Sequence, residues 1–260
     1  MNRVMHSTKL QFENGRGARL SALLDRPRDG KITAYAIFSH CFTCNKLYKG
    51  IRNICQVLCA HGIAVLRFDF TGLGESEGDF TDTTFSDNIQ DIIMAARFME
   101  THFEAPSLMI GHSLGGAATL AAAAQVTSCR AVVTIASPSE PAHVLDHFPE
   151  LRAVIESKGE AGIRVGGIDY MVNRRFVEDL DGCDLGAAIE KLGRALLILH
   201  SPQDKTVDIV NAARIFSRAC HPKSFVSLDR ADHLMMDRKD AAYAGEVIAA
   251  WSAPYVEGVE

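Results

Sequence analysis

The sequence lacks any long apolar run. Nowhere are there the roughly eighteen consecutive apolar residues of a membrane-spanning helix, and the opening stretch has no run of signal-peptide length. We therefore expect a cytoplasmic protein without a membrane span. No internal repeat, low-complexity stretch or linker divides the 260 residues, and 47% hydrophobic residues are enough to fill one core without help from metals. One main domain is expected.

The chain also lacks a run of charge of one sign. Its 27 Lys and Arg residues against 32 Asp and Glu residues give a formal net charge of −5, and the basic residues gather nowhere. A chain of this kind is not expected to bind nucleic acid.

Cysteine is present in a number that does not favour a disulfide framework. There are seven cysteines, an odd number, in a chain of ordinary size, so reduced thiols are expected. Cys41 and Cys44 form a C-x-x-C pair and Cys55 and Cys59 lie one helical turn apart, so a redox or zinc site is an alternative. Cys55 shares the apolar face of its expected helix, which favours core packing for that residue.

Short apolar, β-branched runs recur along the chain, and helical periodicity lies between several of them, as at 51–58 and 89–96. Such alternation predicts an α/β fold with a mostly parallel central sheet and helices on both faces. An antiparallel hairpin is expected before these units, from 9–12 and 18–24. The buried strands are expected at 33–38, 63–68, 107–110, 131–135, 195–199 and 224–228.

One segment breaks this alternation. Residues 138–192 contain no long apolar strand but several charged stretches with glycine, so we interpret them as an inserted cap. The core would then consist of residues 1–137 and 193–260. Within the cap, Gly166 and Gly167 stand between short alternating runs, which predicts a hairpin.

The clearest functional motif is a strand, a sharp turn and a helix around Ser113. The expected strand runs into Gly111-His112-Ser113-Leu114-Gly115-Gly116, and an alanine-rich helix follows. Small residues two positions before and after a serine let the strand and the helix approach closely. The helix N-terminus would stabilise negative charge beside Ser113. The alternative is a glycine-rich connection without catalytic function.

This motif resembles the nucleophile elbow of alpha/beta-hydrolases, and the order of elements resembles theirs from about Lys9 to Trp251. The resemblance implies an alpha/beta-hydrolase fold with an inserted cap, and Ser113 as the nucleophile. It also implies an acid after a late strand and a histidine after the last strand. Neither a cofactor nor a metal is implied.

Both implied residues are present. Asp204 follows the expected strand at 195–199, where its carboxylate can accept the imidazole Nδ1 proton, and Asp208 is the alternative as acid or as a helix cap. His233 follows the last expected strand and is predicted to be the general base. His221 precedes that strand and would lie at the wrong end of the sheet.

Two backbone amides are candidates for the oxyanion hole. One belongs to Leu114, the residue after the nucleophile. The other belongs to Phe42, in a loop that resembles the family's His-Gly-Phe pattern with Cys41 in place of glycine. Cys41 and Cys44 also resemble a pattern of bacterial hydrolases fused to an OsmC-like peroxide-reducing domain, and a redox function for the pair is left open. Residues 69–76 look like a family loop, interpreted as a tight structural turn.

These residues together predict a serine hydrolase that cleaves small-molecule carboxylic esters through an acyl-enzyme. Thioesters and amides pass through the same intermediate, feruloyl-type esters are an alternative, and the cap is expected to set specificity. A hypothesis of another class is a non-catalytic binding protein on the same fold, and a third is a thiol or metal redox protein. The sequence leaves the oligomeric state open.

Overall fold

The centre of the structure, a computed structural model that describes residues 5–165 and 167–256, is a twisted sheet of eight described strands. Its strands are β1 (Met5–Glu13), β2 (Arg19–Pro27), β3 (Ala34–Ser39), β4 (Ile63–Phe68), β5 (Leu108–His112), β6 (Ala131–Ile135), β9 (Ala195–His200) and β10 (Lys223–Ser227). They lie in the order β1-β2-β4-β3-β5-β6-β9-β10. Neighbours from β4 to β10 are parallel, while β1 and β2 pair antiparallel. The predicted mostly parallel sheet, mixed at one edge, is confirmed.

The six apolar runs of the sequence form the strands β3, β4, β5, β6, β9 and β10. Strands β4, β5, β6 and β9 are buried along their whole length, which is why they appear as continuous apolar runs rather than alternating ones. Strands β4 and β6 have the expected ends, and the ends of the other four differ from the expected ones by at most two residues. The N-terminal hairpin extends further than expected, with pairing from Met5↔Pro27 to Glu13↔Arg19.

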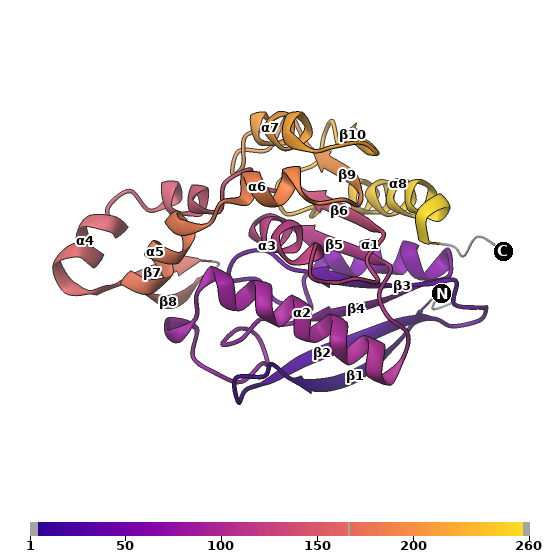
Figure 1. Ribbon diagram of the computed structural model, residues 1–260, viewed down its shortest axis with the longest axis horizontal. Helices are drawn as coiled ribbons and strands as arrows, with labels where there is room; N and C mark the ends of the chain where they lie inside the picture. Colours follow the sequence, from indigo (N-terminus) through magenta and orange to yellow (C-terminus); the bar gives the residue numbers. More distant parts are fainter. Residues whose placement is uncertain (1–4, 166, 257–260) are drawn as a thin grey trace.

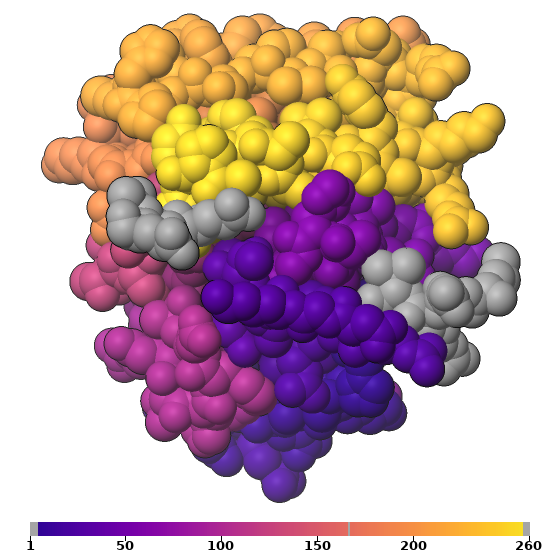
Figure 2. Space-filling view, turned by 90° about the vertical axis from the view of Figure 1, so that its right-hand side faces the viewer, coloured from indigo at the N-terminus to yellow at the C-terminus, as the bar shows by residue number. Residues whose placement is uncertain are grey.

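Helices cover both faces of the sheet (Figure 1). One face carries α1 (Lys49–Ala60) and α8 (Arg238–Val256), which lie side by side at the end of the molecule seen in Figure 2. The other face carries α2 (Phe85–His102), α3 (Leu114–Ala123), α6 (Leu185–Glu190) and α7 (Val210–Arg218). Among the described helices, none is both long enough and apolar enough to cross a bilayer.

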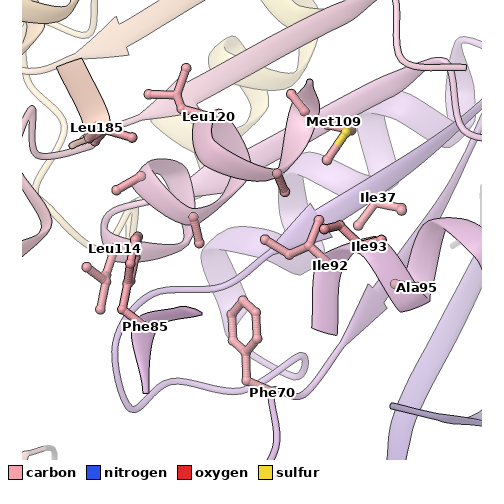
Figure 3. Packing of buried hydrophobic residues seen from close by; sticks show 14 of the residues in the cluster. Ile37, Phe70, Phe85, Ile92, Ile93, Ala95, Met109, Leu114, Leu120 and Leu185 are labelled. Atoms are coloured by element: carbon pink, nitrogen blue, oxygen red, sulfur yellow. The ribbon is translucent and has the colours of Figure 1, made fainter. Parts of the chain in front are cut away.

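The larger of two hydrophobic clusters fills the space between the sheet, α2 and α3 (Figure 3). Ile92 and Ile93 of the predicted apolar stripe point from α2 toward Ile37 and Met109 of the sheet. Burial of each such side chain contributes about 1.5–3 kcal/mol to folding. The rim of the sheet is therefore a rigid base for the loops that follow its strands.

Between β6 and β9 the chain leaves the sheet. This segment, residues 138–192, interpreted above as an insertion, forms η2 (Pro141–His147), α4 (Leu151–Lys158), β7 (Glu160–Val165), β8 (Ile168–Asn173), α5 (Arg174–Gly182) and α6. Strands β7 and β8 are the predicted antiparallel hairpin, although Gly166 of its expected turn lies outside the described residues. Most of the insertion projects to one side of the molecule, whereas α6 lies above α3 (Figure 1). The short η1 (Phe80–Asp82) precedes α2 and contacts β8.

Candidate active site

The three predicted residues Ser113, Asp204 and His233 meet at one rim of the sheet. Ser113 directly follows β5, and the other two lie in the loops after β9 and β10. The Oγ of Ser113 is 3.0 Å from Nε2 of His233, and Nδ1 of His233 is 2.8 Å from Oδ2 of Asp204. All three are buried. Strands that run parallel bring their carboxyl ends together, so residues 120 positions apart in sequence come within hydrogen-bonding distance.

The turn at Ser113 has the strained backbone of a sharp connection between strand and helix. Its φ is 56° and its ψ is −126°, which a residue with a side chain rarely adopts. A Cβ at Gly111 would lie 2.4 Å from the carbonyl oxygen of Gly115, and one at Gly115 would lie 2.2 Å from the carbonyl oxygen of His40. Both positions therefore require glycine, as the sequence pattern predicts.

The carboxylate of Asp204 is fixed on both oxygens. Its Oδ1 accepts hydrogen bonds from the backbone N–H groups of Thr206 (2.8 Å) and Val207 (2.9 Å), which leaves Oδ2 for His233. Burial alone would raise the pKa of Asp204, but the hydrogen bond and charge of His233 and the two backbone bonds lower it below its usual range. The alternative acid, Asp208, instead accepts from the N–H of Val210 (2.8 Å) at the start of α7.

Two buried histidines, not predicted as site residues, hold the loops of the site. His112, the last residue of β5, donates from Nε2 to the carbonyl oxygen of His233 at 2.7 Å. His200, the last residue of β9, donates likewise to the carbonyl oxygen of Val207 at 2.8 Å. Burial, and then the charge of His233, lowers the pKa of His112 to about 3, and burial lowers that of His200. Both act as neutral donors. Their position at strand ends was the signal that could have identified them.

Phe42 and Leu114, whose amides are the predicted oxyanion donors, line the same cavity as Ser113 and His233. Leu114 is the first residue of α3, and the first N–H groups of a helix have no partner within it. Phe42 lies in a turn closed by the N–H of Cys44 and the carbonyl oxygen of Cys41, so its own amide is outside that bond. Cys41 itself has no positive φ, whereas Thr43 does, at 55°. The side chain at the position of the family's glycine is therefore accommodated.

Two residues after this turn, the buried Lys46 forms ion pairs with the buried Asp69 and the exposed Glu75, and these hold the loop that contains Phe42. The Nζ of Lys46 is 2.5 Å from Asp69 and 2.8 Å from Glu75, and the Asp69 carboxylate also accepts from the N–H of Lys46 at 2.6 Å. A Cβ at Gly74 would clash with the Asp69 carboxylate at 2.3 Å. The loop at 69–76 therefore has an anchoring function, in agreement with its interpretation as a structural turn.

The expectation of reduced thiols is wrong for one pair, because Cys41 and Cys44 form a disulfide. The turn brings their Cα atoms to 5.3 Å, within the range that a disulfide requires. The odd number of cysteines argued against a disulfide framework but gave no information about this one turn. The other five cysteines are free, and Cys55 is fully buried in the cluster beneath α1 and α8, in line with core packing.

A cavity of about 530 Å³ opens beside Ser113. Its size is that of a small-molecule site, and its wall is mainly apolar. The insertion contributes Pro138, His143, Val144, His147, Phe148, Arg164, Val165 and Ile168 to this wall. Within residues 5–165 and 167–256, no three His, Cys, Asp or Glu side chains are grouped so that they could hold a metal ion.

The fold and the serine at its strand–helix turn define an alpha/beta hydrolase. A family model described as "Alpha/beta hydrolase family" matches residues 36–247, and the chain belongs to this family. The esterase domain of a Rhodothermus marinus protein is 45% identical, with a TM-score of 0.80 over 97% of this chain and 100% of that one. The chain is accordingly an alpha/beta hydrolase.

More distant relatives share the fold. Est1E from Butyrivibrio proteoclasticus, solved with ferulic acid, has a TM-score of 0.79 at 18% identity, over 96% of this chain and 100% of that one. Palmitoyl-protein thioesterase ABHD10, mitochondrial, from Mus musculus is 27% identical over 198 residues, which are 73% of this chain and 64% of the relative. The chain thus spans less than two thirds of the length of this relative and of its rat and human counterparts.

Proposed function

We propose that this protein cleaves carboxylic esters of small molecules through an acyl-enzyme on Ser113. The observation that carries the proposal is the unbroken hydrogen-bond chain from Ser113 Oγ through the His233 imidazole to the Asp204 carboxylate. A serine hydroxyl is a weak nucleophile at neutral pH, and an adjacent oriented imidazole is the group that activates it.

In the first half of the reaction, Ser113 Oγ attacks the ester carbonyl while His233 Nε2 takes the serine proton. Asp204 holds the Nδ1 proton of the ring and stabilises the imidazolium that forms. The amides of Leu114 and Phe42 bind the oxyanion of the tetrahedral intermediate. His233 then gives its proton to the leaving alcohol, and the carbonyl re-forms as the acyl-enzyme.

In the second half, water attacks the acyl group, and His233 first accepts the water proton and then returns it to Ser113 Oγ. The acid product leaves and the enzyme is regenerated. Since no step uses an electron acceptor or a Lewis acid, the residues described here complete the cycle without a cofactor.

Residues 138–192 act in this proposal as the cap that sets substrate preference. Val144, Phe148 and Val165 supply apolar surface to the cavity, so an apolar acyl or alcohol group is the best match for it. The remaining residues, 1–137 and 193–260, form the catalytic core.

Thioester cleavage is the second candidate, because it uses the same intermediate and because the curated relatives at 25–27% identity are named palmitoyl-protein thioesterases. Feruloyl-type esters are a further alternative, suggested by a neighbour that shares the fold alone. The complete triad argues against a purely binding function.

A fluorophosphonate probe with mass spectrometry tests the nucleophile. We expect covalent modification at Ser113; modification elsewhere, or none, would favour a binding protein. A panel of p-nitrophenyl esters of increasing acyl length, with the matching acyl thioesters, then tests the substrate class. If the enzyme cleaves the acyl thioesters but none of the oxygen esters, thioester cleavage replaces ester cleavage as the proposed function.

A further inference from the structure

The four-residue turn from Cys41 to Cys44 has a conformation that its own sequence does not favour. Thr43, its third residue, has a φ of 55°, where such turns usually have glycine. Threonine is β-branched, and a β-branched residue at positive φ is an outlier that persists only when surrounding contacts hold it. Contacts of its side chains must therefore hold the turn in this conformation.

The structure shows what holds the turn. The disulfide between Cys41 and Cys44 closes it across its ends. On the outside, the hydroxyl of Tyr170 on β8 donates to the carbonyl oxygen of Thr43 at 3.2 Å. The ring of Phe42 packs against Phe176 of α5, with ring centroids 5.8 Å apart. Of these contacts, the disulfide is the covalent one and the one that reversible chemistry can remove.

We propose that the Cys41–Cys44 disulfide is a positioning device for the Phe42 amide, so that the hydrolase activity depends on its oxidation state. This inference rests on the proposed function, in which that amide binds the oxyanion. Reduction by a dithiol breaks the S–S bond and delivers two electrons and two protons. Two thiols form on the protein, and the dithiol becomes a disulfide.

Reduction would leave the triad in place. Ser113, Asp204 and His233 follow β5, β9 and β10, and none of them contacts the turn through a hydrogen bond in the described structure. The N–H of Phe42 belongs to the peptide that joins Cys41 to Phe42, so it is held through Cys41, one end of the disulfide. Once the disulfide is broken, Cys41 and the strained Thr43 can both change their backbone angles, and the Cys41–Phe42 peptide between them can rotate. The loss would fall on transition-state binding, and hence on kcat, more than on ground-state binding.

The pair is chemically accessible and distinct from the other cysteines. Cys41 and Cys44 line the cavity beside Ser113, and Cys44 is half-buried, so a small dithiol can reach the bond. Burial raises the pKa of Cys59 and Cys129 to about 12, which keeps these thiols unreactive. Cys220 is exposed and serves as the control.

The experiment compares the purified full chain before and after dithiothreitol, with alkylation and mass spectrometry to count free thiols. We expect reduction to lower kcat for a p-nitrophenyl ester roughly tenfold to a hundredfold, with a much smaller change in KM, and reoxidation to restore it. The double variant C41S/C44S should have the kcat of the reduced enzyme, and dithiothreitol should not change it. Cys220→Ser should respond as the wild type does.

A trifluoromethyl ketone separates positioning from loss of structure, because its oxyanion occupies the proposed hole. Its affinity should fall by the same factor as kcat/KM on reduction, while the affinity for the acid product stays constant. Should the double variant not fold, reversible reduction of the wild-type chain supplies the same comparison. The inference is overturned if the reduced enzyme, shown by alkylation to have two more free thiols, keeps the kcat of the oxidised enzyme. It is also overturned if Cys41 and Cys44 are free thiols in the chain as purified.

Failure of the proposed function is distinguishable from failure of this inference. If no ester or thioester is turned over in either state, the rate of Ser113 labelling by a fluorophosphonate remains as the readout. Faster labelling of the oxidised chain supports the positioning function of the disulfide, and equal rates contradict it. No labelling in either state contradicts both proposals.

Discussion

The two halves of the candidate site are held in different ways. The triad half, made of Ser113, Asp204 and His233, follows the ends of buried strands and is fixed by short hydrogen bonds among buried groups. The oxyanion turn, from Cys41 to Cys44, is partly exposed and depends on a cross-link and on contacts from the insertion. The first half is part of the core, whereas the second is supported from outside it.

Under the proposed function, this difference separates the half that transfers protons from the half whose contacts can change. A group that transfers protons has to keep its distance from its partner to within a fraction of an ångström, and a close-packed sheet edge provides that rigidity. A turn held by contacts that can change is a place where substrate, cap or redox conditions can alter the rate.

The largest effect is expected from the nucleophile itself. Ser113→Ala removes the attacking oxygen, so kcat should fall by a factor on the order of 10⁵–10⁶. Initial rates with a p-nitrophenyl ester and loss of fluorophosphonate labelling check this, with the exposed Ser157→Ala on α4 as a control of unchanged rate. If Ser113→Ala kept more than a few per cent of the wild-type kcat, Ser113 would not be the nucleophile.

The next effect separates the two candidate acids. Asp204→Asn should lower kcat by roughly 10²–10⁴, because the amide cannot stabilise the imidazolium or hold its tautomer. The matched change Asp208→Asn should leave kcat as it is, since that side chain faces the N–H of Val210. Steady-state kinetics of both variants decide the assignment. A larger loss at Asp208 would reverse it.

The pH dependence of stability tests the neutral histidine beneath His233. Because the pKa of His112 is about 3 in the folded protein and near 6.5 without burial, the unfolded chain takes up the proton first as pH falls. The free energy of unfolding should therefore be highest above pH 6.5. Below that pH it should decline by up to about 1.4 kcal/mol per pH unit, until the pH nears 3.

His112→Asn should flatten this decline, while exposed His6→Asn should leave its slope unchanged. Denaturant unfolding at pH 7, 6, 5 and 4.5 supplies the slopes. Equal slopes in wild type and His112→Asn would mean that the histidine is not held neutral by its surroundings. The core around His112 and His233 would then be less tightly packed than the structure shows.

The smallest effect concerns the outer support of the oxyanion turn. Tyr170→Phe keeps the ring but removes the hydroxyl that donates to Thr43, a hydrogen bond worth about 1 kcal/mol, so kcat should fall about fivefold. Tyr243→Phe, at an exposed tyrosine of α8, is the matched control. An effect on KM alone would place Tyr170 in substrate binding and not in support of the turn.

Much of the architecture was predictable because local pattern and tertiary position coincide along a parallel sheet. A short run rich in β-branched residues, such as Ala131–Ile135, favours a buried strand, and the parallel order places the residue after each strand end at the rim. The choice of Asp204 over Asp208 as the candidate acid depended on the same strand order. In the structure, Asp204 is hydrogen-bonded to His233, whereas Asp208 is hydrogen-bonded to the N–H of Val210.

Other features were beyond the sequence for a physical reason. An odd cysteine count argues against a framework, but whether Cys41 and Cys44 bond depends on a turn whose positive φ at Thr43 no propensity predicts. The contact from Tyr170 joins residues 127 positions apart on separate elements, with no periodicity to connect them. The hydrogen-bond partners of His112 and His200 likewise depend on how distant loops pack.

The sequence by itself determined the order of strands and helices, the glycines of the elbow and which serine, acid and base follow which strand, since these depend on the chain within a few residues. Only the tertiary structure decided which atoms meet: the 3.0 Å approach of Ser113 to His233, the neutral histidines beneath it and the cross-linked turn beside it. Contacts between distant segments are fixed by the packing of the whole core, and the sequence encodes that packing only collectively.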